Sequence, residues 1–346
     1  MTQHMTGVSD LSNPRADVQL PENRPTSMRA AVIEETGCPD VLHVSEVDLP
    51  IRINAEVLVR VAGAGVNPLD VKTRAGRGVS AAIASYPYIL GQDFSGIVAE
   101  SPYEGHPLKV GDEVYGMLSA PRGQGSYAEY AAVPAMQLCK KPGRLSLIEA
   151  AGVPVAALTA WGMVVDVAKA HQGQRILIHA GAGGVGHFAV QFAAYFGASV
   201  IATSSARNAS WLRELGAAEV IDYTTTRFED AVSGVDVVID LIGNVHDDTG
   251  TRSLQTLRPG GLIINAPTGS WPSVIEDAHA LGLRATTYKV SPDAATLTII
   301  TRLINSGDVH VHIDEVFELS DAAEAHRRLE EGHTRGKLVI NVAEHL

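Results

Sequence analysis

The most constraining feature of the sequence is the glycine-rich stretch HAGAGGVG at residues 179–186. An apolar run of strand length, RILIHA, precedes it, and a segment with helical spacing follows it at residues 185–197. The stretch contains the pattern GxGxxG, which is weak evidence alone but gains weight between a strand and a helix. A strand, a glycine turn and a helix begin a βαβ unit, so we expect a parallel sheet. A glycine turn without any ligand is the alternative.

The glycines of this turn have separate steric roles in a dinucleotide site. Gly181 permits the tight turn, Gly183 lets a pyrophosphate approach the backbone, and Gly186 lets the helix pack against the strand. The free N–H groups and the positive dipole end at the start of the helix attract the anion. We therefore expect the whole turn to bind a dinucleotide phosphate: Gly181, Ala182, Gly183, Gly184, Val185 and Gly186.

The pattern of the chain changes near residue 146. Residues 28–145 contain short strand-like runs separated by glycine and proline, typical of a β-rich, barrel-like unit. Residues 146–170 have the spacing of a helix, with Ser146 and Glu149 as its capping box. Strands then alternate with helices, which builds a doubly wound parallel sheet with helices on both faces, the Rossmann fold. The predicted fold class is therefore α/β.

This change of pattern also predicts the domains. We expect a flexible tail over the polar residues 1–27, the β-rich domain over 28–154 and the Rossmann domain over 155–288. Residues 289–346 end in a strand, a helix and a strand, which we expect to return to the first domain. A chain of 346 residues exceeds one typical core, in agreement with two domains.

The end of the next predicted strand indicates which dinucleotide binds. A NAD site carries an acidic residue there for the ribose 2′-hydroxyl, yet none occurs from residue 187 through residue 213. Ser204, Ser205 and Arg207 stand there instead, and hydroxyl groups and a guanidinium can bond a 2′-phosphate. The sequence thus favours NADPH, with Tyr223 beside the adenosine. A solvated Arg207 and an ordinary surface Tyr223 are the alternatives.

Charge and composition exclude several other partners. The formal net charge is −12, so a nucleic acid is not expected to bind. No apolar run reaches about 18 residues, and the first 27 residues lack the apolar core of a secretory signal. Cys38 and Cys139 cannot form a disulfide framework, which suits a reducing cytoplasm. We therefore expect a cytoplasmic protein with no membrane contact.

Several motifs together resemble a known family. VNPLDVKTRAG at 66–76, LGQDFSGIVAE at 90–100, GSYAEYAAV at 125–133, the glycine turn and the closing GKLVI at 336–340 are similar to the medium-chain dehydrogenase/reductase superfamily. The most similar branch is the zinc-independent quinone oxidoreductases, which resemble zeta-crystallin. The resemblance implies a GroES-like catalytic domain before the Rossmann domain, NADPH as cofactor, an active site between the domains, and a homodimer or homotetramer.

The sequence departs from the zinc-dependent branch of that superfamily. Gln92 and Asp93 stand where zinc alcohol dehydrogenases carry His-Glu, and no cysteine occurs near the NPLD motif. A catalytic zinc needs three protein ligands, and a structural zinc needs four. Two distant cysteines do not supply them, so we expect no metal.

Without a metal, hydride transfer to a quinone or an α,β-unsaturated carbonyl is the favoured chemistry, because a hydrogen-bond donor can stabilise the resulting enolate. By the resemblance, Asn67 lies near the nicotinamide and Lys72 at the active site, where a desolvated ammonium can protonate the enolate or hold its charge. A turn residue before Pro68 is the alternative for Asn67, and a solvated side chain is the alternative for Lys72. Asp70 is expected to brace this loop.

The remaining candidate residues come from strand ends and from the resemblance. Tyr86 and Tyr88 are expected to line the substrate entrance, with packing alone as the alternative. Thr159 resembles a position near the nicotinamide ribose. The resemblance implies that the turn DLIGN, which contains Ile242, approaches the adenine and ribose side of the cofactor. Asn265 ends the next predicted strand, at the edge where open sheets bind ligands, so we expect it at the cofactor too.

Three functions fit these residues. The leading interpretation is an NADPH-dependent reductase of a small-molecule quinone or enone. An enoyl-type reductase of a thioester or polyketide intermediate would use the same fold and cofactor. A non-catalytic NADPH-binding protein is the third. Asn67 and Lys72 favour an enzyme over the third interpretation.

Overall fold

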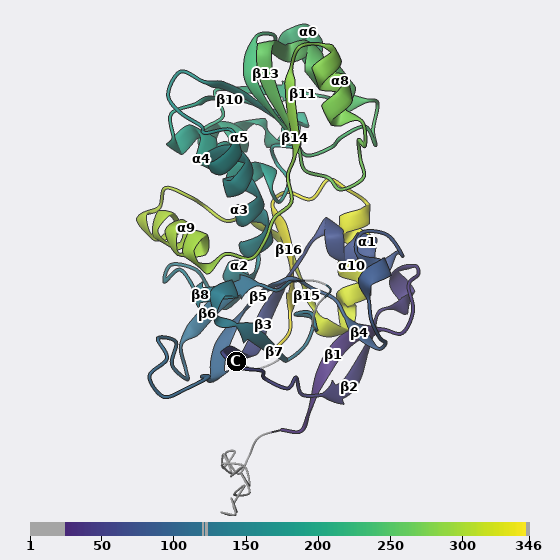
Figure 1. Ribbon diagram of the computed structural model, residues 1–346, viewed down its shortest axis with the longest axis vertical. Helices are drawn as coiled ribbons and strands as arrows, with labels where there is room; N and C mark the ends of the chain where they lie inside the picture. The colour runs from purple at the N-terminus through teal and green to yellow at the C-terminus, as the bar shows by residue number, and fades with distance from the viewer. Residues whose placement is uncertain (1–24, 120, 122–123, 344–346) are drawn as a thin grey trace, which may run out of the picture.

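The computed structural model describes residues 25–119, 121 and 124–343 (Figure 1). The predicted flexible tail therefore lies outside the described residues, apart from residues 25–27, and Ser27 already begins the first strand. The chain forms two parts, one built on a six-stranded sheet and the other on a seven-stranded and a three-stranded sheet. Within the described residues, no helix is long and apolar enough to cross a membrane.

One part is the predicted parallel sheet, drawn in the upper half of Figure 1. All its strand pairs are parallel, and the strand order is β11-β10-β9-β12-β13-β14. From β9 the chain adds strands first on one side, β10 and β11, and then on the other, β12 to β14, so the connecting helices cover both faces of the sheet. The prediction of a doubly wound α/β sheet is confirmed. Its strands are β9 (Arg175–Ile178), β10 (Ser199–Ser204), β11 (Glu219–Asp222), β12 (Val235–Asp240), β13 (Leu257–Asn265) and β14 (Arg284–Thr287).

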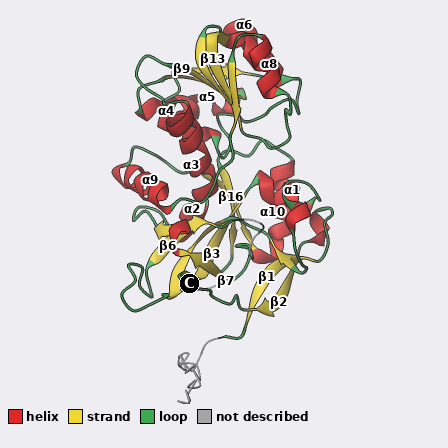
Figure 2. Cartoon of the chain, in the orientation of Figure 1, coloured by secondary structure: helices red, strands yellow, loops and turns green. Residues whose placement is uncertain are grey.

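Helices cover this sheet (Figure 2). The first, α3 (Pro154–Trp161), continues as a π-helix over Gly162–Val167. The others are α4 (Gly186–Tyr195), α5 (Ala209–Glu214), α6 (Phe228–Ala231), α7 (Thr249–Ser253) and α8 (Val274–Ala280). A further helix, α9 (Ala294–Ser306), packs instead against α3 and against β8 (Leu138–Lys140) of the other part.

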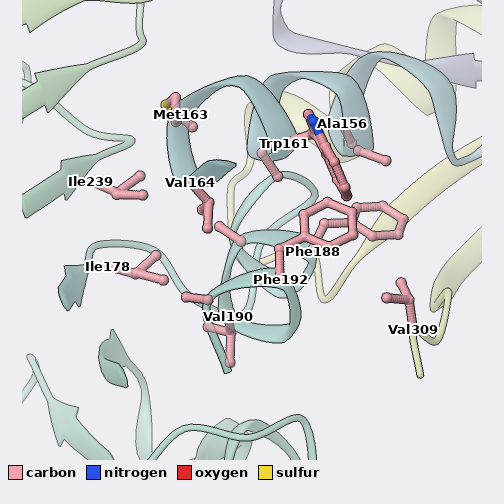
Figure 3. Packing of buried hydrophobic residues seen from close by; sticks show 14 of the residues in the cluster. Ala156, Trp161, Met163, Val164, Ile178, Phe188, Val190, Phe192, Ile239 and Val309 are labelled. Atoms are coloured by element: carbon pink, nitrogen blue, oxygen red, sulfur yellow. The ribbon is translucent and has the colours of Figure 1, made fainter. Parts of the chain in front are cut away.

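The core under α4 fixes the glycine turn in place (Figure 3). Phe188 and Phe192 of α4 are fully buried, and the Trp161 ring of α3 lies edge-on to Phe192 with ring centroids 5.3 Å apart. Ile178, at the end of β9, belongs to the same cluster. Because the strand before the turn and the helix after it are packed on this core, the turn between them has a defined position.

The other part is β-rich, as predicted. Its seven-stranded sheet has the order β15-β16-β3-β5-β6-β8, with β7 also pairing β3, and a smaller sheet has the order β2-β1-β4. The strands are β1 (Ser27–Ile33), β2 (His43–Asp48), β3 (Glu56–Val66), β4 (Tyr88–Ile89), β5 (Asp93–Glu100), β6 (Glu113–Met117), β7 (Tyr130–Pro134), β8 (Leu138–Lys140), β15 (Ile313–Glu318) and β16 (Lys337–Asn341). Its helices are α1 (Pro68–Arg74), α2 (Leu147–Ala151) and α10 (Ala322–Glu330), and its short 3₁₀ turns are Pro39–Val41, Ser80–Ala82, Ala135–Gln137 and Leu319–Asp321. The parallel-sheet part has 3₁₀ turns at Ala206–Asn208 and Leu254–Thr256.

The prediction of a single helix over residues 146–170 is wrong, because the segment forms more than one helix. Its capping box is present, because the Ser146 hydroxyl accepts from the Glu149 N–H and the Glu149 carboxylate accepts from the Ser146 N–H. However, α2 ends at Ala151 and a separate helix begins at Pro154. Proline has no N–H group and favours the first turn of a helix, so it starts a new helix here.

The C-terminal segment returns to the β-rich part. β16 pairs antiparallel with β3, with Leu338 opposite Val66. This pairing places Lys337, the first residue of β16, beside Asn67, which follows β3. The domain boundaries 28–154, 155–288 and 289–346 stay predictions.

Candidate functional site

A cavity of about 290 Å³ lies where the two parts meet. The glycine turn, the end of β10, the start of α1 and the segment before β16 contribute its walls. Many of the predicted cofactor residues line it, together with Asn67: Ala182, Gly183, Gly184, Val185, Ser204, Ser205, Arg207 and Tyr223.

The glycine turn shapes this cavity through its close packing. A Cβ on Gly186 would lie 2.1 Å from the Ala180 carbonyl oxygen, and one on Gly181 would lie 2.9 Å from the Ala202 Cβ. Gly181 and Gly186 are therefore packed against the protein and do not line the cavity. At Gly183, the nearest atom to an added Cβ is the Ala180 oxygen at 3.3 Å, and this residue does face the cavity.

The end of β10 carries polar groups without acidic neighbours. No acidic side chain is found among the described residues that line the cavity. The Arg207 guanidinium donates one hydrogen bond to the His333 carbonyl oxygen at 2.7 Å, which leaves other N–H groups of its fork for a ligand. The Ser204 hydroxyl donates to the Ser205 carbonyl oxygen at 3.0 Å, and Tyr223 is 51% exposed. This end of the cavity can hold a phosphate.

Sequence reasoning missed the segment that closes the cavity on the C-terminal side. The Gly336 N–H donates to the Ala182 carbonyl oxygen at 2.9 Å, which ties this segment to the glycine turn. The Arg335 guanidinium lies 4.2 Å from the Trp211 ring centroid, a cation–π contact across the two parts. The motif GKLVI was a usable signal, but it supported only the family resemblance. The missed lining residues of this segment are Leu329, Gly332, His333, Thr334, Gly336, Lys337 and Leu338.

Another part of the cavity wall belongs to a buried polar cluster that we call the inner corner: Asn67 and Lys337, which line the cavity, with Asp70 and Asp93 behind them. The Lys337 ammonium donates to the Val66 carbonyl oxygen at 3.0 Å, to the Asn67 amide oxygen, and to Asp93 at 3.3 Å. The Asn67 amide nitrogen donates to the same Asp93 oxygen at 3.0 Å. Three acceptors match the three N–H donors of an ammonium, so Lys337 has no free donor.

The two carboxyl groups of the inner corner have unusual pKa values. Burial, aided by the nearby Asp93 charge, raises the pKa of Asp70 to about 7. Burial also raises the pKa of Asp93, although Lys337, Asn67 and the Val155 N–H oppose that rise. Asp70 accepts the Asn67 N–H at 3.0 Å, so it caps α1 and braces the loop.

These contacts define what Asn67 can do. Its amide nitrogen has two N–H donors, one directed at Asp93 and the other at the Gly65 carbonyl oxygen 3.4 Å away. Its amide oxygen accepts from Lys337. Asn67 lines the cavity with its hydrogen-bonding capacity already used within the protein, which fits a positioning role.

Lys72 lies at the rim of the cleft and does not line the cavity. It is half-buried on α1, and its ammonium lies 3.4 Å from the Thr268 carbonyl oxygen in the loop after β13. Burial lowers the pKa of Lys72, and the charges of Arg77 and Lys289 lower it further. Lys72 therefore connects the two parts and holds its proton less tightly than a solvated lysine.

The other predicted site residues do not line the cavity. Tyr86 is 44% exposed, whereas Tyr88 is buried on β4, and burial raises its pKa to about 12. The Thr159 hydroxyl donates to the Val155 carbonyl oxygen within α3 at 2.6 Å.

Ile242 and Asn265 share one partner beyond the cavity. The Ile242 N–H donates to one Asp240 carboxylate oxygen at 2.9 Å, and the Asn265 amide donates to the other at 2.8 Å. Both residues therefore shape the ends of β12 and β13. Their predicted contact with the cofactor stays a prediction.

The described residues do not offer a zinc site. Among them, no group of three or more His, Cys, Asp and Glu side chains could hold a metal ion. Asp93 is paired with Lys337, and the Gln92 amide nitrogen lies 3.5 Å from the Leu118 carbonyl oxygen. A buried ammonium beside Asp93 would repel a second cation, so these residues do not fit zinc.

Comparison with known proteins identifies the family. Residues 54–143 match the family described as Alcohol dehydrogenase GroES-like domain, and residues 215–340 match Zinc-binding dehydrogenase. NAD(P)H oxidoreductase RTN4IP1, mitochondrial, of Danio rerio is 31% identical over 93% of this chain and 93% of that protein. The quinone oxidoreductase structure from Coxiella burnetii has a TM-score of 0.86 and 37% identity, covering 92% of this chain and all of that one. This chain belongs to the medium-chain dehydrogenase/reductase superfamily.

A further relative agrees with the predicted branch of the superfamily. The NADPH-dependent alkenal/one oxidoreductase, chloroplastic, of Arabidopsis thaliana is 34% identical over 95% of this chain and 82% of that protein. The resemblance to the quinone oxidoreductase branch and the prediction of a GroES-like plus a Rossmann domain are confirmed. The second matching family is named for zinc binding. In this chain, however, the Asp93 carboxylate is paired with the Lys337 ammonium.

Proposed function

We propose that this protein is an NADPH-dependent, zinc-independent reductase that transfers hydride to a quinone or to the C=C bond of an enone. The observation that carries the proposal is the phosphate end of the cavity, where Ser204, Ser205 and Arg207 stand without an acidic side chain. Relatives named as a quinone oxidoreductase and an alkenal/one oxidoreductase support the substrate class.

The two ends of the cavity suit the two ends of this cofactor. The glycine turn and the start of α4 offer backbone N–H groups to the pyrophosphate. The Arg207 guanidinium and the hydroxyl groups of Ser204 and Ser205 bind the 2′-phosphate. When bound, the cofactor supplies the hydride.

The inner corner positions the backbone at another part of the cavity wall. Lys337 holds the Val66 carbonyl oxygen and the Asn67 side chain, and Asp93 accepts the Val155 N–H at 2.6 Å. These bonds connect β3, α3 and β16 around one point. Their joint role is to hold this wall of the cavity rigid, so that a substrate is bound in a fixed orientation.

Lys72 supplies the proton or holds the enolate charge. Hydride addition to an enone leaves negative charge on the carbonyl oxygen, which a nearby ammonium stabilises. The lowered pKa of Lys72 favours proton release. Its bond to Thr268 connects α1 to the loop after β13, so closure of the two parts would bring this ammonium toward the substrate.

A spectroscopic assay tests this function. The purified protein is mixed with NADPH and a panel of quinones and enones, and NADPH oxidation is followed by its absorbance. We expect turnover with at least one quinone or enone and much weaker turnover with NADH. NADPH binding without any turnover would instead indicate a non-catalytic NADPH-binding protein.

We further propose a cytoplasmic homodimer or homotetramer. The two cysteines are both free, which suits a reducing compartment, and β14 is an unpaired edge of the parallel sheet that a second copy can extend. Light scattering after gel filtration tests the assembly, and a monomeric mass would exclude it. Fractionation of cells tests the compartment.

A further inference from the structure

Two ammonium groups meet at one residue on the rim of the cleft. The Lys72 ammonium lies 3.4 Å from the Thr268 carbonyl oxygen, and the Lys289 ammonium lies 3.3 Å from the Thr268 hydroxyl oxygen. Arg77, in the turn after α1, is close enough for its charge to act on Lys72. Lys289 and Arg77 are exposed to solvent. We call Lys72, Arg77 and Lys289 the cationic rim.

No described carboxylate pairs with the cationic rim. Other cations of the chain do form ion pairs, such as Arg52 with Glu100 at 2.8 Å and Lys141 with Glu113 at 2.9 Å. In the part of the chain that the structure describes, no residue of the cationic rim forms an ion pair with a carboxylate. The chain carries a net charge of −12, so carboxylates are abundant, yet those that the structure describes form no ion pair with these cations.

The cationic rim is separate from the cofactor cavity. None of its residues lines that cavity, whose phosphate end is at Ser204 and Arg207. Five residues separate Lys72 from Asn67, which corresponds to about 7.5 Å along a helix. The other side of the rim is the loop after β13, at the edge of the sheet where open α/β sheets bind ligands. The rim therefore lies beside the carboxyl end of β13 in the parallel sheet.

We propose that the cationic rim binds an anionic group of the substrate, a carboxylate or a phosphate, a few bonds away from the reacting double bond. This inference rests on the proposed function and narrows its substrate class to unsaturated carbonyl compounds that carry a negative charge. Two ammonium groups within hydrogen-bond distance of one residue can contact a single anion together, and Arg77 adds a planar fork of donors. A neutral enone engages only Lys72, through its enolate, and leaves the charges of Lys289 and Arg77 without a partner.

Matched substrates test the inference directly. An enone with a carboxylate three methylene groups away from the double bond, 7-oxo-5-octenoic acid, is compared with its methyl ester and with a phosphate ester of comparable length by kcat/KM with saturating NADPH, because esterification at that distance leaves the reactivity of the double bond unchanged. We expect the wild-type protein to prefer a charged compound over the methyl ester by about tenfold or more, which corresponds to about 1.4 kcal/mol. That preference should fall as salt is added, because exposed charges are screened. The acid and phosphate arms distinguish the two anions.

Variants at Lys289 and Arg77 then test whether the preference for a charged substrate depends on the cationic rim. The double variant Lys289→Gln with Arg77→Gln should lose most of the preference for the charged compound, with an unchanged KM for NADPH. Lys109→Gln is the matched control, because Lys109 is an exposed lysine in the turn between β5 and β6, bonded to the Glu104 carbonyl oxygen. It should retain the wild-type preference.

The failures of the two ideas are distinguishable. If no quinone or enone is reduced at all, the proposed function is wrong. If the methyl ester is used as well as the charged compounds, or if the double variant keeps the wild-type preference, the anion site is wrong and the reductase proposal stands. Calorimetric titration of the acid into protein with NADP⁺ gives a second readout, and equal affinity in the wild type and the double variant would overturn the inference.

Discussion

The inner corner and the cationic rim each contain a lysine, but the two lysines have opposite surroundings. Lys337 is fully buried, and three oxygen atoms accept its three donors. Lys72 is half-buried, bonds to one backbone oxygen, and has only cations as charged neighbours. The comparison teaches that an ammonium beside a cleft is available to a ligand only when the protein leaves it without a counter-charge.

Burial explains why these surroundings have different consequences. A buried charge without its partner is costly, so the inner corner is a tightly matched set whose members depend on one another. A partly exposed charge is solvated, so the rim tolerates unpaired cations at little cost. Changes in the inner corner should therefore alter stability, and changes at the rim should alter activity.

Replacing Lys337 should give the largest effect. Lys337→Met leaves the Asp93 carboxylate buried without its cation, which should lower the free energy of unfolding by about 3–5 kcal/mol. Denaturant titration measures this loss. The double variant Lys337→Met with Asp93→Asn removes both charges and should recover part of it. A single variant that is nearly as stable as the wild type would show that the inner corner does not depend on this pair.

The pH dependence of stability tests the role of Asp70 in the inner corner. Its pKa is about 7 in the folded protein, against 3.8 for an ordinary aspartate, so the folded state holds the proton more tightly than the unfolded state. The contribution of Asp70 to stability is thus greatest in acid and is lost as the pH rises through 7. Asp70→Asn keeps an acceptor for the Asn67 N–H but does not ionise. Its stability relative to the wild type should rise between about pH 4 and about pH 7 by at most about 4 kcal/mol.

Chemical denaturation at several pH values measures that difference. Asp112→Asn is a suitable control, because Asp112 lies outside the cleft and its pKa is lowered by the Lys109 N–H and by Lys140. Its stability relative to the wild type should fall as the pH rises toward about 4, where Asp112 ionises, and should stay nearly constant between about pH 5 and about pH 7. A pH-independent difference for Asp70→Asn would mean that Asp70 does not titrate in this range.

The cofactor end of the cleft was predictable from the sequence, whereas the inner corner was not. The turn at Gly183 and the polar residues at Ser204 lie in continuous motifs, whose chemistry follows from local spacing. Lys337 contacts Asn67 across 270 positions of the chain, and only the pairing of β16 with β3 brings them together. No spacing rule encodes such a contact.

The expected substrate residues illustrate the same limit. Tyr86 and Tyr88 are two positions apart, yet one is exposed and the other is buried among the strands of the small sheet. Their exposure depends on how the loop before β4 packs, which the local pattern does not determine. The predicted fold class is nevertheless correct, because it depends on the alternation of whole strands and helices and not on the packing of single side chains.

Lys72 tests the rim side of the comparison. Lys72→Ala should lower kcat for a neutral enone about a hundredfold, the scale of general acid catalysis, with little change in the KM for NADPH or in stability. The proposed role of the ammonium as proton donor predicts that wild-type kcat falls as the pH rises through the lowered pKa of Lys72, well before an ordinary lysine would titrate. Steady-state kinetics over a range of pH measures both effects. The kcat of the variant should not show this fall with pH. A kcat equal to that of the wild type would show that Lys72 is only a surface residue.

Arg207 should give the smallest effect, because its exposed guanidinium interacts with a phosphate that water also solvates. Arg207→Ala should weaken NADPH binding about tenfold, near the lower limit for a hydrogen bond to a charged group, and should leave NADH binding almost unchanged. Fluorescence titration with both cofactors measures this, and Arg213→Ala, an exposed arginine on α5, is the matched control. Arg207 also donates to the His333 carbonyl oxygen, so its loss can loosen the segment that closes the cavity. Equal weakening for NADPH and NADH would therefore assign Arg207 to holding that segment, and only a selective loss of NADPH assigns it to the 2′-phosphate.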